Sequence, residues 1–232
     1  MPLTAEPEFP AGLPERITGP SAWVGPDLLA RGGWIETLGP QDLAEIEAAL
    51  QPWLPDSADM AQITAASFPL PTLAPRLTGP DGLLGELLEG RGFTLLRGLP
   101  VADWGLRKSA IAFFGLGAHL GAARSQNAQG HLLGHVRDLG LSSDDPKVRI
   151  YQTAERQTFH TDSADLVGLL CLQTARSGGL SALVSSVTLY NEMRRRRHVA
   201  VDCNSHKIPT ARRLLAPFRK RFWRREPIET VV

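Results

Sequence analysis

The chain has 232 residues, 43% hydrophobic content and a formal net charge of +1, which suits one domain with a sizeable core. Its 22 glycines, 18 prolines and few aromatic residues favour a loop-rich β architecture over a helical bundle. With two cysteines, no apolar run of membrane-spanning length and no signal-peptide pattern, we expect no disulfide framework and no membrane partner, and a cytoplasmic location.

The first part of the chain predicts an extended lead-in, two helices and one strand. Residues 1–20 contain five prolines and little apolar periodicity, which indicates an extended segment. Residues 41–50 carry apolar side chains at helical spacing and predict a short amphipathic helix. Residues 81–89 place four leucines on one helical face ahead of two glycines, which predicts a second helix. Residues 93–96 then predict a short apolar strand.

A longer helix is expected next, with Asp103 as its N-cap and Phe114 near its end. The glycines at positions 115, 117 and 121 are expected to break it. His131 and His135 follow at the spacing H-x-x-x-H, but the glutamate of the zinc-protease motif is absent and glycines flank both. We therefore interpret these two histidines as structural.

The second half of the chain predicts strands. Residues 148–153 alternate between apolar and polar side chains, and residues 166–172 are apolar on both faces, as in a strand covered on both sides. A double glycine turns the chain, and residues 180–185 predict the returning strand. Ser185 or Ser186 can cap the helix that follows. Short strands with glycine-rich turns indicate a sandwich or jelly roll.

Between these strands lies the tripeptide His160-Thr161-Asp162. Side chains at positions i and i+2 of an extended chain point to the same face, so the imidazole of His160 and the carboxylate of Asp162 can converge on one cation. They are two of the three ligands in the 2-His-1-carboxylate site of non-haem Fe(II). An H-x-D tripeptide alone is weak evidence, and a satisfied polar pair is the alternative interpretation.

The wider context strengthens the metal interpretation. Phe-His-Thr-Asp at residues 159–162, the apolar run, Ala-Arg-Ser-Gly-Gly-Leu-Ser at residues 175–181 and the capped helix together resemble the taurine dioxygenase (TauD)/TfdA-like family of Fe(II)- and 2-oxoglutarate-dependent dioxygenases. The resemblance implies an α+β, mainly β fold: a double-stranded β-helix, or clavaminate synthase-like jelly roll, with flanking helices. The corresponding domain spans residues 21–197 and is expected to be an incomplete jelly roll.

The same resemblance implies the reaction components and their ligands. His160 and Asp162 would be iron ligands and catalytic residues, with 2-oxoglutarate as co-substrate, and dioxygen would react with a small organic substrate. Ser181, after the double glycine, would help bind the far carboxylate of 2-oxoglutarate. A turn hydroxyl that satisfies local backbone is an equally good interpretation of Ser181.

Three further residues are candidates for substrate contact. Gln126 and Asn127 lie in a polar loop that borders the site mouth in the family, although capping of turns explains them at least as well. Tyr151 precedes the motif and would line the pocket. The nature of the substrate and the oligomeric state cannot be inferred from the sequence.

The family pattern also requires a second histidine and then an arginine well downstream of H-x-D. Only His198 and His206 follow the motif, and neither has family-like surroundings, so we assign no third ligand. Residues 194–232 hold 12 Lys/Arg against 3 Asp/Glu, and the basic tail at residues 198–232 shows no clear family match. We interpret the tail as the end of a truncated or frame-disrupted chain. A basic element that contacts nucleic acid is the second interpretation of the same residues.

Three functions follow from the sequence, in descending order of support. The first is a Fe(II)/2-oxoglutarate dioxygenase, for which a truncated and inactive chain is left open. The second is a non-catalytic derivative of the same fold that binds a small acid. The third is a nucleic-acid-binding protein with a basic tail, against which the net negative charge of residues 1–193 argues.

Overall fold

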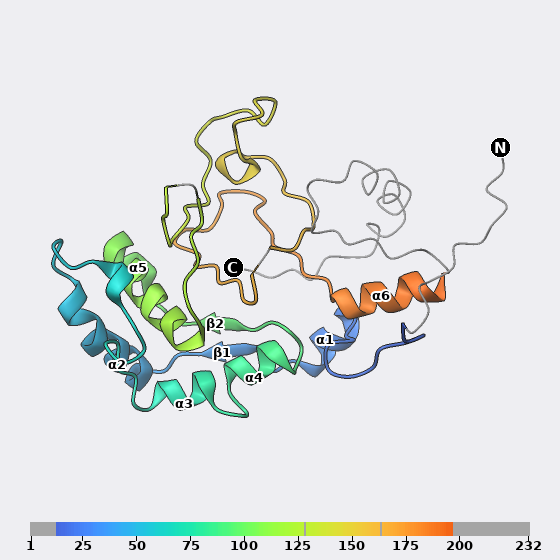
Figure 1. Cartoon of the computed structure of the whole chain (residues 1–232), viewed down its shortest axis with the longest axis horizontal. Helices are drawn as coiled ribbons and strands as arrows, with labels where there is room; N and C mark the ends of the chain where they lie inside the picture. The colour runs from blue at the N-terminus through green and yellow to red at the C-terminus, as the bar shows by residue number, and fades with distance from the viewer. Residues whose placement is uncertain (1–12, 128, 163, 197–232) are drawn as a thin grey trace.

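The computed structural model of the chain describes residues 13–127, 129–162 and 164–196. Helices gather around two short strands and are followed by a long irregular stretch and a last helix (Figure 1). The elements in chain order are α1 Gly25–Arg31, β1 Ile35–Thr37, α2 Pro40–Leu50, α3 Leu73–Thr78, α4 Leu83–Leu88, β2 Leu95–Arg97, α5 Val101–Leu120 and α6 Ser186–Arg195, with single-turn 3₁₀ helices at Gln51–Trp53, Met60–Gln62 and Ile150–Gln152.

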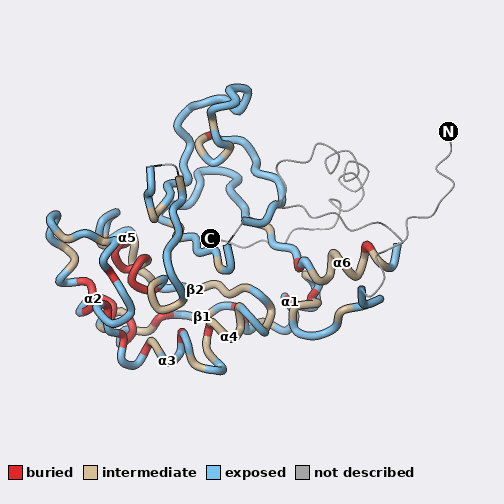
Figure 2. Tube along the Cα trace, viewed as in Figure 1, coloured by how far each residue is buried: buried red, intermediate tan, exposed pale blue. Residues whose placement is uncertain are grey.

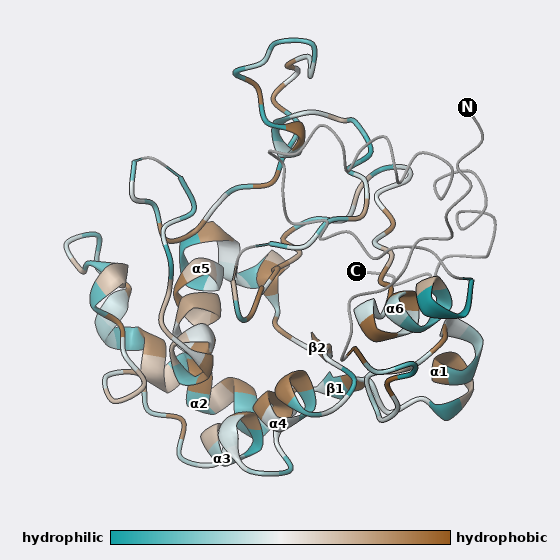
Figure 3. Cartoon of the chain, turned by 45° about the vertical axis from the view of Figure 1, so that its right-hand side comes forward, coloured by the Kyte–Doolittle hydropathy of each residue, from teal (hydrophilic) through white to brown (hydrophobic). Residues whose placement is uncertain are grey.

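The main hydrophobic core lies between α2, α3 and α5 and the loop that joins α2 to α3. Ile46 and Leu50 from α2, Phe68 from the loop and Ile111 from α5 are almost fully buried. Figure 2 shows the buried positions concentrated on these helices, and in Figure 3 both α4 and α5 carry long hydrophobic stretches. Each such side chain contributes about 1.5–3 kcal/mol when buried, so this core holds the helices together.

β1 and β2 form a parallel two-stranded ladder, in which Glu36 pairs with Leu96. Parallel neighbours need a long crossover, and the chain through α2, α3 and α4 provides it. A second, smaller core beside this ladder contains Trp23, Leu28 and Trp34. Phe93 packs against it, with its ring centroid 5.3 Å from that of Trp23 in an edge-to-face arrangement.

The first helices and the first strand of the sequence analysis are present, with small shifts. The helix predicted at residues 41–50 is α2, the helix predicted at residues 81–89 is the shorter α4, and the strand predicted at residues 93–96 is β2, displaced toward the C-terminus. Among the α-helices and strands, α1, α3 and β1 had no counterpart in the prediction. A proline in the first turn of α1 was an available start signal.

The start of α5 differs from the prediction. Its N-cap is Pro100, and Asp103 lies inside the first turn without acting as the cap. Gly105 has φ +68 and ψ 179, a left-handed conformation that separates this first turn from the long remainder of the helix. The start signal at Asp103 therefore marked the right region and the wrong residue.

The end of α5 corrects the prediction in part: neither Gly115 nor Gly117 breaks the helix, which ends at Leu120 with Gly121 as its C-cap. An internal glycine costs about 1 kcal/mol relative to alanine. Burial of Ile111 and Phe114 on the core-facing side offsets that cost. Within the described part of the chain, no helix combines the length and apolarity that crossing a membrane requires.

α6 begins as predicted, with Ser185 as its N-cap accepting a hydrogen bond from the Thr188 amide at 3.0 Å. The helix binds the N-terminal segment through its side chains. Asn191 accepts a hydrogen bond from the Ile17 amide and donates one to the Ile17 carbonyl, both at 2.8 Å, and Tyr190 donates to the carbonyl of Pro14. The two ends of the described chain are thereby joined.

The strands predicted between α5 and α6 are absent. A 3₁₀ helix replaces the strand expected at residues 148–153, residues 166–172 are irregular, and within residues 180–185 only Ser181 lies in an isolated bridge. Leu169, expected to be covered, is 80% exposed. An apolar run forms a strand only where a partner strand lies beside it. The described residues contain two three-residue strands, so the mainly β fold is not seen in them.

The outer segments of the prediction lie outside the described residues. These are residues 1–12 of the proline-rich lead-in and the whole basic tail at residues 198–232. His198 and His206 belong to that tail.

Candidate metal centre

His160 and Asp162 lie in irregular chain after the 3₁₀ helix Ile150–Gln152, and their side chains face each other. The Nε2 atom of His160 is 3.9 Å from Oδ1 of Asp162. The side chains are 33% and 56% exposed, so a cation can reach both. The convergence expected of a strand is thus produced by an irregular loop.

Two contacts indicate which tautomer the His160 ring adopts. Its Nδ1 is 2.8 Å from the carbonyl oxygen of Thr158. Because a carbonyl only accepts, Nδ1 must carry the proton. The side-chain amide of Gln157 donates to Nε2 at 3.1 Å, so Nε2 carries the lone pair. Histidines that bind metal usually donate their other ring nitrogen to a carbonyl or carboxylate in this way.

These donors fit two positions of an Fe(II) site. An imidazole nitrogen with a free lone pair and a carboxylate oxygen are suitable ligands. In His160 the nitrogen with the lone pair is Nε2, which is also the nitrogen in contact with Asp162. Metal bonds of about 2.1 Å at right angles would place the two atoms about 3 Å apart, so the pair must close by about 1 Å. Both side chains are partly exposed, so their rotation can close this distance once the hydrogen bond from Gln157 to Nε2 is broken.

The third position has no candidate in the described ranges. Across residues 13–127, 129–162 and 164–196, no group of three His, Cys, Asp or Glu side chains could hold a metal ion. The described residues therefore contain an imidazole–carboxylate pair and not a complete triad.

Ser181 follows the glycine turn of the motif. Gly178 and Gly179 both have φ of +69, a conformation that other residues rarely adopt. A Cβ atom on Gly179 would also lie 2.6 Å from that of Ala175. The turn thus requires glycine, and Ser181 is exposed on its far side.

Gln126 and Asn127 make local contacts, as the capping interpretation requires. The Gln126 amide donates to the carbonyl of Arg124 at 2.8 Å. The Asn127 side-chain oxygen accepts hydrogen bonds from the amides of Gln129 and His131, each at 3.1 Å. These bonds stay within one loop, and in the described residues they do not join it to His160.

Tyr151 lies in the 3₁₀ helix Ile150–Gln152, where its side chain is 37% exposed. Its backbone carbonyl accepts a hydrogen bond from the amide of Arg137 at 3.1 Å. The structure thus brings His160 and Asp162 together, whereas the contacts described for Tyr151 are with another loop. Gln157 and the Thr158 carbonyl were not predicted, although Gln157 stands only three residues before the histidine.

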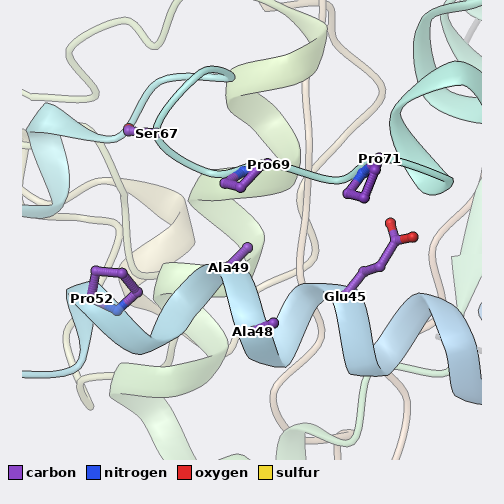
Figure 4. A pocket seen from close by; sticks show the side chains of 7 residues that line it. All are labelled: Glu45, Ala48, Ala49, Pro52, Ser67, Pro69 and Pro71. Carbon is purple, nitrogen blue, oxygen red and sulfur yellow. The ribbon is translucent and has the colours of Figure 1, made fainter.

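Two pockets lie elsewhere on the molecule. One, of about 330 Å³, lies between α2 and the loop at residues 67–71, where Pro69 and Pro71 stand opposite Ala48 and Ala49 (Figure 4). Its carboxylate, Glu45, accepts hydrogen bonds from Thr72 and Leu73. The other, of about 230 Å³, lies between Trp23, Phe93 and the start of α6. Neither pocket is lined by His160 or Asp162.

Comparison with known proteins identifies a family and two relatives that match most of the chain. The sequence profile described as "Taurine catabolism dioxygenase TauD, TfdA family" matches residues 52–227. The "Taurine hydroxylase-like protein SAT17" of Stachybotrys chartarum is 30% identical over 190 residues, which cover 78% of this chain and 48% of that protein. The "FR-33289 synthase" of Streptomyces rubellomurinus is 29% identical over 182 residues, covering 78% and 53%.

The coverage of these relatives is as informative as the identity. The chain spans about half the length of the curated relatives it matches. The profile match includes the H-x-D motif and extends into the basic residues beyond 197.

Proposed function

The chain belongs to the TauD/TfdA family, and from that premise we propose that it serves as an Fe(II)- and 2-oxoglutarate-dependent dioxygenase acting on a small organic substrate. Members of the family generally depend on Fe(II) and 2-oxoglutarate. The names of the two relatives describe a taurine hydroxylase-like protein and a synthase. The jelly roll that the family implies is part of the same proposal.

One observation in the structure supports the proposal above the others. The Nε2 lone pair of His160 and a carboxylate oxygen of Asp162 are 3.9 Å apart, and Nδ1 is held protonated by the Thr158 carbonyl. A histidine in the opposite tautomer would have to exchange its proton before binding metal. His160 therefore needs no change of tautomer to act as a ligand.

The proposed roles follow from these positions. Bound Fe(II) would supply the activation of dioxygen coupled to decarboxylation of the 2-oxo acid. His160 and Asp162 would hold the metal on one side, and the Thr158 carbonyl would fix the orientation of the imidazole. Ser181 would donate its hydroxyl to the far carboxylate of 2-oxoglutarate, at the end of a turn that glycine keeps compact.

Metal binding tests this proposal directly. We expect Co(II), used as a stable spectroscopic substitute for Fe(II), to give ligand-field bands that change when it binds the protein. His160→Ala and Asp162→Ala should each weaken Co(II) binding by tenfold or more, because each substitution removes one of the two protein ligands. As controls, His135→Ala removes another imidazole and Asp165→Ala removes another carboxylate. Neither residue belongs to the His160–Asp162 pair, so both substitutions should leave the Co(II) affinity unchanged.

The reaction is tested on the same protein with Fe(II) and 2-oxoglutarate under anaerobic conditions. A charge-transfer absorption band followed by succinate after admission of oxygen is the expected result for a dioxygenase. Equal metal affinity in wild type, His160→Ala and Asp162→Ala would overturn the proposal.

A non-catalytic protein that binds a small acid is the second candidate. The absence of a third ligand in the described ranges favours it, because two protein ligands hold Fe(II) weakly. It predicts binding of 2-oxoglutarate without succinate formation, measured by calorimetry and product analysis on the same sample.

A further inference from the structure

The side chain of Gln157 forms a hydrogen bond with the His160 nitrogen that a metal ion would need. Its amide nitrogen donates to His160 Nε2 at 3.1 Å. On the other side of the ring, Nδ1 donates to the Thr158 carbonyl at 2.8 Å. Two consecutive residues, Gln157 and Thr158, thus satisfy both ring nitrogens of the same histidine.

We propose that Gln157 is a positioning residue that protects the Nε2 lone pair of His160 in the metal-free protein and is displaced when a metal ion binds. This inference rests on the proposed function, because it requires that His160 be a ligand. A nitrogen has one lone pair in the ring plane, so the amide hydrogen and the metal cannot occupy it together. Binding must therefore break the Gln157 hydrogen bond.

The two contacts of the ring differ in what metal binding does to them. The bond from Nδ1 to the Thr158 carbonyl can persist, since a ligating histidine keeps its other N–H bonded. The bond from Gln157 cannot. Thr158 thus orients the ring in both states, and Gln157 orients it only before the metal arrives.

The free Gln157 side chain would then lie beside the metal. Gln157 is exposed, so its amide can rotate away without disturbing packed groups. The carboxamide oxygen could then accept a hydrogen bond from a molecule bound at the metal. The Nε2 atom of His160 would thus have a partner in both states, Gln157 without the metal and the metal ion when it is bound. The His160 ring would remain ordered in both.

Substitutions of Gln157 give opposite expected effects on metal affinity. With Co(II) as the probe, Gln157→Ala should bind about 3- to 10-fold more tightly than wild type, because one hydrogen bond no longer competes. Gln157→Glu should bind more tightly still, since a carboxylate adds attraction for the cation. Gln157→Lys should bind more weakly than wild type, since an ammonium repels it. Gln173→Ala, at an exposed glutamine in the same irregular region, is the matched control.

Nitrogen-15 NMR of the histidine ring provides a readout that needs no metal. Wild type should show the Nδ1–H tautomer at His160, and Gln157→Ala should shift the Nε2 signal toward that of an unbonded nitrogen while Nδ1 remains protonated. A protein in which Gln157 only stabilises the loop would show no such selective change.

The outcomes separate this inference from the proposed function. If His160→Ala does not weaken Co(II) binding, both fail. If His160→Ala weakens it but Gln157→Ala and Gln157→Lys match Gln173→Ala, the proposed function stands and the role of Gln157 is wrong. A shifted Nε2 signal together with the expected order of affinities supports the inference.

Discussion

Asp42 links helix α2 to helix α3 through hydrogen bonds. Its carboxylate is 8% exposed and accepts hydrogen bonds from the Gly39 amide, at the start of α2, and from Arg76 of α3 at 2.7 Å. Arg76 also pairs with Glu36 of β1 at 2.6 Å. One carboxylate therefore caps α2 and, through Arg76, links it to α3 and the strand ladder.

Replacement of Asp42 should destabilise the fold in a pH-dependent way. Burial raises the pKa of Asp42, but the hydrogen bonds from Gly39 and Arg76 outweigh it and hold the pKa below its ordinary value of 3.8. A lowered folded pKa gives stability that is present above pH 3.8 and lost as the pH falls through the folded value. Asp42→Asn should therefore cost about 1–3 kcal/mol at pH 7 and less at pH 3, measured by urea unfolding.

A second substitution distinguishes this network from ordinary surface charge. Asp56 also faces an arginine, Arg107, at 3.5 Å, but its side chain is 99% exposed. Asp56→Asn should change the free energy of unfolding by less than about 1 kcal/mol at either pH. An equal effect of both substitutions would show that Asp42 does not connect the helices as described.

At the scale of one element, α5 contains a matched pair of glycines with opposite surroundings. A Cβ atom on Gly115 would lie 2.6 Å from the ring of Phe68, which is fully buried. A Cβ atom on Gly117, two residues later, would meet nothing within 4 Å. Both lie in the same helix, so alanine has the same intrinsic advantage at both positions.

The two alanine substitutions should therefore change stability in opposite directions. Gly115→Ala should lower the free energy of unfolding by about 1–3 kcal/mol, because the ring of Phe68 must move within a packed core. Gly117→Ala should raise it by about 0.5–1 kcal/mol through helix propensity alone. Thermal or urea unfolding measures both, and destabilisation by Gly117→Ala would indicate that the helix does not continue past residue 115.

The same helix shows what the sequence could and could not predict. Periodic apolar residues correctly located α2, α4 and the α5 region, because helices depend on local pattern. The glycines of α5 were misjudged, since their effect depends on Phe68, a residue distant in sequence. At the site, the sequence expected His160 and Asp162 to converge from a strand, whereas an irregular loop brings their side chains to 3.9 Å. The role of Gln157 likewise depends on a loop conformation that no motif describes.

For the molecule as a whole, the main contrast is between the packed helices and the described residues that join α5 to α6. Their apolar run at residues 166–172 has the composition of a covered strand, but within the described residues no strand pairs with it. Val167 and Leu169 are 57% and 80% exposed. Exposed apolar chain of this kind favours association between molecules.

This contrast predicts different responses to substitution in the two regions. Leu169→Lys should change the free energy of unfolding by less than about 0.5 kcal/mol and should raise solubility, because the side chain is already in water. Ile111→Ala, in the helical core, should cost about 2–5 kcal/mol. Hydrogen exchange should likewise find the amides near Leu169 unprotected and those near Ile111 protected up to the global free energy of unfolding. Strong protection near Leu169, with a large cost for Leu169→Lys, would mean that another strand covers this segment in solution, and the exposed arrangement would then be wrong.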